Sequence, residues 1–462
     1  MRRVIGTDVT CPPKPEGRRW KTGSHVLLLA FALWPAGSAN AQDAPGPVVR
    51  LTLDEARARA LEASHRLAEA RARETVAQAG VAAREAAERP MVSASAGYTR
   101  TNHVTPFFVP GPTGLPRAIY PDVPDNYRTR LDLQWAIYTG GRTDALERAA
   151  RAEAGAAAAD VDAARADLRL EVARAFWAVV TARAAVGVVE EALERAGVNV
   201  GDARQRLAAG LVPPNEVASA EAQQARQRML LVEARNQRDV ASADLARLVG
   251  LDPSQAVEPV ADLQRPASAE PTFDALAREG LARRSERKAL ELRISAADLQ
   301  KAAAAAGRKP AIAVGAGADY ARPNPKIFPR AERWDDSWDA GVNVTWSLWD
   351  GGRVAADVAQ AAGAADAVRA RLREFDSVLA VEVRQRSLEI SSGTAAVAAA
   401  DEAVRAAAEA RRVVGERYRA GVIAQGDVLD AELQLLQSQL DRTRAQASVR
   451  LAEARLDRVL GR

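Results

Sequence analysis

The sequence predicts a mainly α-helical protein with a smaller β portion, built from two tandem copies of one structural unit. Three observations support this fold class. The sequence repeats itself over a long distance, it contains two proline-free segments rich in Ala, Arg and Glu, and it contains segments in which apolar and polar residues alternate. The composition is typical of long packed helices, and alternation with a period of two is typical of strands.

The internal repeat appears when the sequence is compared with itself at an offset of 211 residues, without a gap. This offset aligns 135–142 (WAIYTGGR) with 346–353 (WSLWDGGR), 206–210 with 417–421, and 248–250 with 459–461. We therefore expect a first repeat over residues 42–250, a Pro-bearing linker over 251–270 and a second repeat over 271–462.

The N-terminal segment predicts export. Arg18, Arg19 and Lys21 precede an apolar run at 26–34, and small residues at 39–41 follow it. This order is typical of a secretory signal, which we place at 1–41, with cleavage before Gln42. Beyond it, Arg and Glu interrupt the apolar stretches, so we expect no membrane-spanning helix. These features favour the periplasm, the cell exterior or the outer membrane.

Each repeat is expected to contain the same order of elements. A helix comes first, over 53–88 and 273–307, and a proline ends it. The strands are expected at about 91–101, 127–138, 310–321 and 338–349, with a Pro- and aromatic-bearing loop inside each pair. A Gly-Gly-Arg turn then leads into a long helix, over 143–209 and 354–420, followed by a turn and a returning helix. At ~1.5 Å per residue, each long helix is on the order of 100 Å in length.

The second strand of each repeat has one apolar and one polar face. The apolar positions are Leu131, Leu133, Trp135 and Ile137 in the first repeat and Val342, Val344, Trp346 and Leu348 in the second. Two such hairpins are too few to close a barrel, and an open sheet would expose its apolar face and its edges. We therefore predict a shared barrel, in which several copies contribute four strands each, with apolar faces toward lipid.

Four aromatic residues lie near the helical ends of these second strands, where an interfacial aromatic girdle is expected. They are Trp135, Tyr138, Trp346 and Trp349. The long helices are then expected to form a coiled-coil tube that continues the barrel into the periplasm.

The composition excludes several kinds of chemistry. The 462 residues include one cysteine, Cys11, and three histidines, which excludes a disulfide framework and a Cys/His zinc site. We find no catalytic constellation, and we expect no enzyme activity, cofactor, metal or nucleic-acid binding. Six basic and two acidic residues in 1–41 account for the whole formal charge of +4, so the remainder is formally neutral.

In these features the sequence resembles the TolC-like outer-membrane efflux proteins. The resemblance rests on the duplicated unit, on the aromatic-x-Gly-Gly-Arg segments and on the turns that contain Gly210 and Gly421. It implies a homotrimer with a twelve-stranded barrel in the outer membrane of a Gram-negative bacterium, continued by a helical periplasmic tunnel. It also implies docking with a periplasmic adaptor and an inner-membrane pump, as the passive exit duct of a tripartite efflux or type I secretion system.

The resemblance places a periplasmic gate beside the second helical turn. There, Asp427 and Asp430 are three residues apart and hence on one helix face. In a trimer, six carboxylates would ring the pore, favour cations and bind cationic blockers. The alternative interpretation is that Asp427 is a helix N-cap and Asp430 a solvated acid of the first turn.

Two further residues occupy positions where the family forms contacts between helix pairs, namely Tyr418 and Glu216. Glu216 follows Gly210 by six residues, as Asp427 follows Gly421. Ile423 occupies the position at which, in the best-known members of the family, a basic residue would complete these contacts between helix pairs. The alternative is that Tyr418 is packing.

The two turns are candidates for contact with the adaptor. Their residues are Gly210, Leu211, Val212, Gly421, Val422 and Ile423. The glycines can end a helix in left-handed geometry, and the apolar side chains can act as anchors. The alternative is an ordinary helical hairpin loop.

A different class of function is a periplasmic coiled-coil adaptor, or a structural protein that bridges the membranes. The helices alone are compatible with it. The two amphipathic strand pairs favour the duct, because an adaptor has no reason to show lipid-facing alternation twice.

Overall fold

The computed structural model describes residues 48–111, 114–263 and 272–462. The predicted signal segment 1–41 lies outside the described residues, as do residues 264–270 of the predicted linker.

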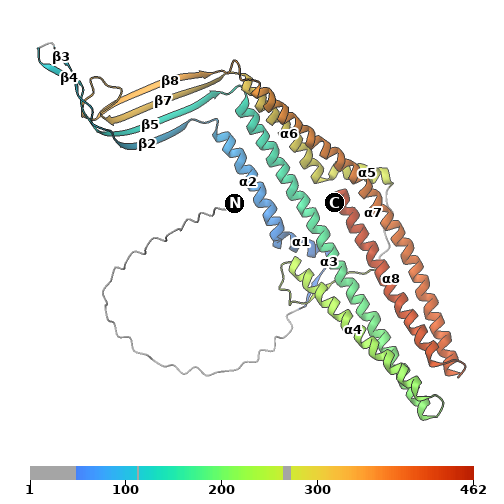
Figure 1. The fold of residues 1–462 in the computed structure, drawn as a ribbon. Coiled ribbons are helices and arrows are strands. Elements are labelled where there is room, and N and C mark those ends of the chain that lie inside the picture. Colours follow the sequence, from blue (N-terminus) through green and yellow to red (C-terminus); the bar gives the residue numbers. More distant parts are fainter. Residues whose placement is uncertain (1–47, 112–113, 264–271) are drawn as a thin grey trace, which may run out of the picture. The chain divides into compact units, whose positions relative to one another are not determined.

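The two halves of the chain contain the same succession of helices and strands (Figure 1). The first half contains β1 (Val49–Leu51), α1 (Leu53–Ala63), α2 (His65–Ala86), β2 (Met91–Arg100), β5 (Asp125–Tyr138), α3 (Arg142–Ala208) and α4 (Pro214–Leu248). The second half contains α5 (Phe273–Arg283), α6 (Ser285–Ala305), β7 (Ala311–Arg322), β8 (Asp335–Thr345), α7 (Arg353–Arg419) and α8 (Gln425–Leu460). The short strand β6 (Val257–Pro259) pairs in parallel with β1.

The first helix of each half is interrupted, where the sequence predicted it as continuous. Ser64 separates α1 from α2 in an extended conformation, and its hydroxyl accepts a hydrogen bond from the N–H of Leu67. It is therefore an N-cap, which starts a new helix. Arg284 adopts the same extended conformation between α5 and α6 without a side-chain cap. A missed serine cap explains the first error, whereas the second break has no capping residue to reveal it.

Four strands form one antiparallel sheet in the order β2-β5-β7-β8. Met91 pairs with Gln134, Tyr138 with Ile312, and Ala311 with Thr345. Because of this register, the strand ends that join the helices all lie at one end of the sheet, here called the helical end. The loops 101–124 and 323–334 lie at the opposite end, here called the loop end.

The strand β8 is displaced from its predicted limits, since it begins at Asp335 instead of 338 and stops at Thr345 instead of 349. Among the described strands its only partner is β7, which begins at Ala311, opposite Thr345, so residues beyond 345 have no described strand to pair with. Trp346 and Trp349 therefore follow the strand. In the first loop, a small hairpin of β3 (Phe107–Pro110) and β4 (Pro116–Tyr120) forms where the sequence predicted only a loop.

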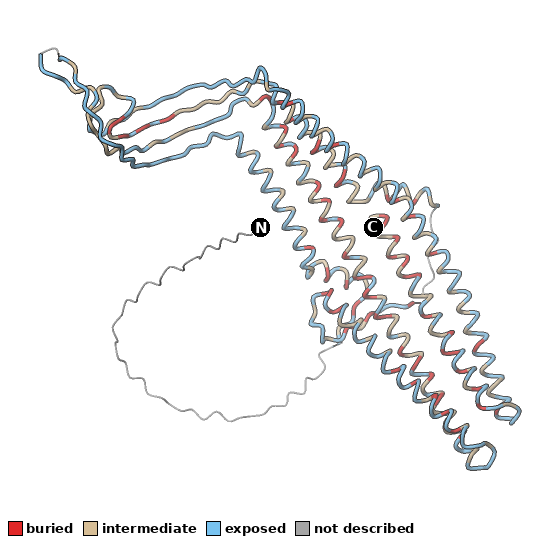
Figure 2. Tube along the Cα trace, viewed as in Figure 1, coloured by how far each residue is buried: buried red, intermediate tan, exposed pale blue. Residues whose placement is uncertain are grey.

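The apolar face of the sheet is exposed. Val342 and Val344 on β8 and Leu131 on β5 are each more than half exposed. Figure 2 shows the sheet mostly as exposed, with buried positions on β7 toward the loop end. No described element covers this face.

The helix α3 is the centre of the helical part. It packs against α1, α2, α4, α6 and α8. One core cluster joins it to α1 and α4 around Phe176, and a second joins α5, α7 and α8 around Leu379 and Val383. Charged residues, among them Arg174 and Arg183, interrupt the apolar stretch of α3 as the sequence predicted, but by length and composition alone this helix is apolar enough to cross a membrane. Its central position among five helices accounts for that composition.

The backbone conformation explains why a pair of glycines precedes each long helix. Gly140, Gly141, Gly351 and Gly352 all have φ between 67° and 87°. Gly141 and Gly352 are the N-caps of α3 and α7. Residues other than glycine rarely adopt this left-handed geometry. The two glycines thus turn the chain from strand into long helix at the same point in each repeat.

Candidate functional site at the helical hairpin tips

The two helical hairpins, α3–α4 and α7–α8, end in identical turns. Gly210 has φ 72° and Gly421 has φ 74°. In the first turn, the N–H of Leu211 donates to the carbonyl of Arg206 at 2.9 Å, and the N–H of Gly210 to that of Leu207. The second turn repeats both bonds, from Val422 to Arg417 and from Gly421 to Tyr418. This pattern is the Schellman motif, which needs a left-handed residue after the helix.

The turns present apolar side chains. Leu211 is 72% exposed and Val422 is 64% exposed, whereas Val212 and Ile423 are half-buried. Exposed side chains of this size, at matching positions of two neighbouring turns, are available for contact with another protein.

Close to the turns, Arg206 joins the two hairpins. The guanidinium of Arg206 in α3 lies 4.3 Å from the ring centroid of Tyr418 in α7. It also donates to the carbonyl of Tyr418 at 2.9 Å and to that of Arg419 at 3.1 Å. A cation is favoured at these last carbonyls of a helix and over an aromatic ring. The sequence did not single out Arg206, although it begins the repeated segment 206–210.

Tyr418 is buried, at 7% exposure. Burial raises the pKa of its hydroxyl above the usual range. The charge of Arg206 opposes this rise in pKa, and the charges of Glu216 and Asp202 add to it. The predicted pair of Tyr418 and Glu216 is thus within electrostatic reach, but no hydrogen bond joins them. The Tyr418 hydroxyl and Glu216 Oε2 are each buried without a partner among the described residues.

The two predicted gate acids lie on the exposed face of α8. Asp427 and Asp430 are both exposed, whereas Gln425 and Val428 of the same turns are buried. The N-cap of α8 is Ala424 and Asp427 is in the first turn, so Asp427 is not the helix cap of the alternative interpretation. Within the described part of the chain, neither carboxylate forms an ion pair. Glu216 occupies the equivalent first turn of α4.

The four predicted interfacial aromatics lie toward the helical end of the sheet. The indole N–H of Trp135 donates to the carbonyl of Glu88 at 2.9 Å, and that of Trp346 to the carbonyl of Arg308 at 3.1 Å. Both rings are therefore fixed to the segment that follows a helix. Tyr138 is 44% exposed and Trp349 is 89% exposed.

The described residues contain no group of three or more His, Cys, Asp or Glu side chains arranged to hold a metal ion.

Solved outer-membrane proteins have the same fold. The chain is 21% identical to the outer-membrane channel OprN, with a TM-score of 0.75 over 88% of this chain and 89% of that one. It is 23% identical to VceC of Vibrio cholerae, with a TM-score of 0.73 over 88% and 96%. It is 20% identical to the MtrE outer-membrane channel of Neisseria gonorrhoeae, with a TM-score of 0.71 over 88% of each chain.

Among curated protein sequences, none matches the chain. The sequence profile of outer membrane efflux proteins matches residues 56–251 and 276–462, which together make up most of the chain and fall one in each repeat. The chain therefore belongs to the outer membrane efflux protein family.

Proposed function

We propose that three copies of this outer-membrane efflux protein close one twelve-stranded barrel, and that their long helices continue it as a periplasmic tunnel. The observation that supports this assembly best is the four-stranded sheet. No described strand pairs with the outer edges of β2 and β8, and the apolar face of the sheet is exposed. Pairing β2 of one copy with β8 of the next removes every free edge.

The strand lengths fit this role. The strand β2 has 10 residues and β8 has 11. A tilted strand needs about 9–11 residues to cross the hydrocarbon core of a bilayer. The opposite face of the sheet contains Arg128, Arg130 and Asp319, which suit a water-filled lumen.

In this assembly the protein is a passive conduit and not a catalyst. A periplasmic adaptor and an inner-membrane pump supply substrate and energy at the hairpin tips, in a tripartite efflux or type I secretion system. A periplasmic coiled-coil adaptor is the weaker proposal, because it leaves the exposed apolar face of the sheet without a purpose.

The acids of α8 are the proposed selectivity ring of the tunnel mouth. Both Asp427 and Asp430 are exposed and form no ion pair with a described residue, and threefold symmetry would gather six carboxylates. The double substitution Asp427→Asn/Asp430→Asn should reduce the preference of the channel for cations and weaken block by Co²⁺. The measurement is the reversal potential and the blocked current of single channels in planar bilayers.

The control for this variant is Asp441→Asn, which removes an acid of α8 that is already hydrogen-bonded to Gln437. It should leave both readings unchanged. An unaltered reversal potential together with an unaltered Co²⁺ block in the double variant would show that the ring has no such role.

The exposed apolar side chains of the turns are the proposed adaptor contact. The variant Leu211→Asp/Val422→Asp should lose co-purification of the adaptor while the trimer remains intact, since both side chains are exposed and neither supports a core. Asn215→Asp adds a charge at the start of α4, next to the turn, but keeps the apolar anchor of the turn, and should behave as the wild type. Normal adaptor recovery with the double variant refutes the contact.

A further inference from the structure

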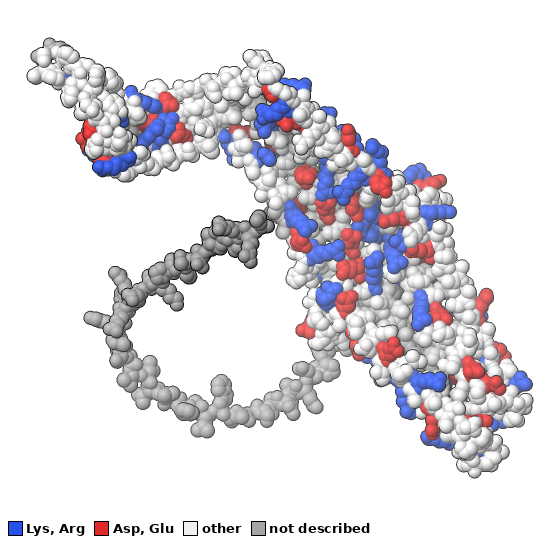
Figure 3. All heavy atoms as spheres, in the orientation of Figure 1, with Lys and Arg blue, Asp and Glu red and all other residues white. Residues whose placement is uncertain are grey.

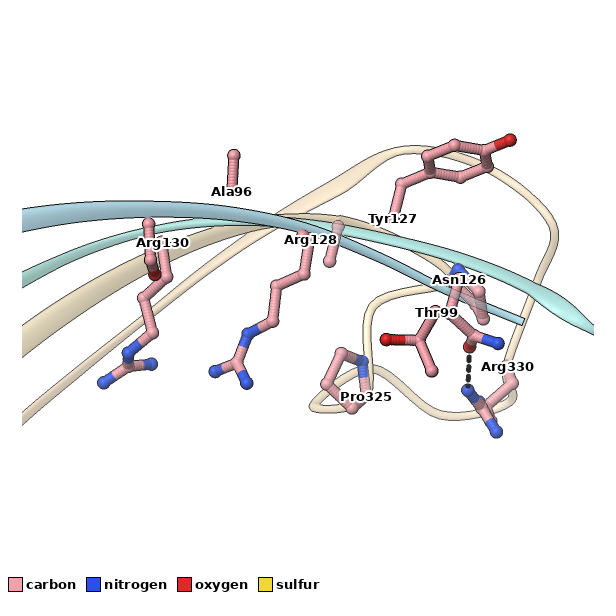
Figure 4. A pocket seen from close by; sticks show the side chains of 12 residues that line it. Ala96, Thr99, Asn126, Tyr127, Arg128, Arg130, Pro325 and Arg330 are labelled. Carbon is pink, nitrogen blue, oxygen red and sulfur yellow. Dashed lines mark hydrogen bonds between the residues drawn. The ribbon is translucent and has the colours of Figure 1, made fainter. Parts of the chain in front are cut away.

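The loop between β7 and β8 lies against the polar face of the sheet. Lys326 pairs with Asp319 of β7 at 2.8 Å and also with Asp339 of β8. Asn324 is 2% exposed, and its amide donates to the carbonyl of Asp335 at 3.0 Å. In Figure 4, Pro325 and Arg330 of this loop lie on the same side of the strands as Arg128 and Arg130.

A cavity of about 340 Å³ opens between this loop and the strands. The basic and hydrogen-bonding side chains that line it on the polar face are those of Ser95, Thr99, Asn126, Arg128, Arg130 and Arg330. Ala96 and Tyr127 belong to the same strands but point to the opposite face in Figure 4. The cavity is therefore on the polar face, at the loop end of the sheet.

Arg128 and Arg130 differ in how many of their guanidinium nitrogens donate hydrogen bonds to carboxylates. Arg130 donates to Asp132, Asp319 and Asp339 through all three of its nitrogens. Arg128 uses only Nε, which donates to Asp319 at 2.6 Å. Its two terminal nitrogens form no hydrogen bond to any described residue, so a guanidinium fork is available to a ligand.

Arg330 is the basic residue of the β7–β8 loop that has no carboxylate partner among the described residues. Of the four basic residues between 322 and 333, Arg322, Lys326 and Arg333 pair with carboxylates. Arg330 donates only to neutral groups, the Tyr120 hydroxyl at 2.7 Å and the Asn126 side-chain oxygen at 3.2 Å. Its Nε is buried without a hydrogen bond among the described residues. A partly buried charge in this state is stabilised by an anion.

We propose that this cavity binds a compact solute anion, a phosphate, sulfate or carboxylate group, between Arg128 and Arg330. The fork of a guanidinium matches two oxygens of such a group, and the hydroxyls of Ser95 and Thr99 supply further donors. The site rests on the proposed duct in one respect, since the polar face is then the lumen. Three copies would place three anion sites at the outer mouth, opposite in sign to the acids of the tips.

The test is block of single-channel current by inorganic phosphate added at the barrel side of a planar bilayer. Wild-type current should fall as phosphate rises. Arg330→Gln and Arg128→Gln should each raise the half-blocking concentration about tenfold or more, because each removes a charge-assisted contact. Arg128→Gln leaves the bonds of Arg330 to Asn126 and Tyr120 in place, so its effect does not depend on displacement of the loop.

The matched control is Arg117→Gln, which removes an exposed arginine of β4 outside the cavity. Phosphate should block the current of this variant at the same concentration as that of the wild type. Absence of block in the wild type, equal block in all variants, or an equal loss in Arg117→Gln each overturns the site.

A protein that conducts no current contradicts the duct and not the cavity. Calorimetric titration of the detergent-solubilised protein with inorganic phosphate then decides the site. Heat of binding that is lost in Arg330→Gln supports it, and the absence of binding heat in the wild type overturns it.

Discussion

At the scale of the residue, the contact of Arg206 with Tyr418 is the feature of the hairpin tips that the sequence did not predict. The sequence predicted Tyr418 and Glu216 as possible partners. It also showed Ile423 at the position where a basic residue was expected. In the structure the cation near Tyr418 comes from α3, and it reaches the ring and two carbonyls at the end of α7. Sequence reasoning could not find it, because the two residues are 212 positions apart and only the packing of the hairpins brings them together.

The substitution Arg206→Gln should loosen the tips of the two hairpins. It removes two hydrogen bonds from a charged donor and the contact with the ring, a loss of about 1–3 kcal/mol between the hairpins. We expect a larger resting conductance of single channels in planar bilayers. Arg204→Gln is the control, since Arg204 pairs with Glu221 inside its own hairpin. Equal conductance of the wild type and both variants contradicts this role for Arg206.

At the scale of the element, the sequence predicted most of the architecture and missed what depends on pairing. The long helices begin and end only one residue before the predicted limits. The prediction is close because Gly141 and Gly352 mark where the helices start. The limit of β8 depends on where β7 begins, which no alternation pattern within β8 encodes. The hairpin of β3 and β4 was missed because prolines flank its short strands.

The two faces of β8 should differ in how strongly a new charge destabilises the protein. Val342 is on the apolar face and is 67% exposed, and the next residue, Asn343, is on the polar face. Val342→Lys should destabilise the protein in lipid by about 1–4 kcal/mol, depending on its depth in the bilayer. Asn343→Lys should have little effect. The measurement is the denaturant midpoint of the protein refolded into lipid vesicles, and equal midpoints for the two variants would exclude a lipid-facing role for Val342.

At the scale of the whole molecule, the location of the charged residues is more informative than the net charge. The segment after the predicted signal is formally neutral. Figure 3 shows mixed charges over the helices, a charge-poor middle of the sheet and a charged cluster at its loop end. The sequence predicted the acids of the tips from spacing and resemblance. It could not predict the cluster around Asp319, because that cluster depends on a loop turned onto the sheet and on five side chains from four segments.

The central claim is that three chains complete one barrel. The most direct measurement is the native mass of the protein extracted with detergent from outer membranes. We predict a single species of three chains, which separates into monomers only on heating. A stable single chain in the membrane extract, or a protein released as a soluble monomer from the periplasm, would contradict the claim.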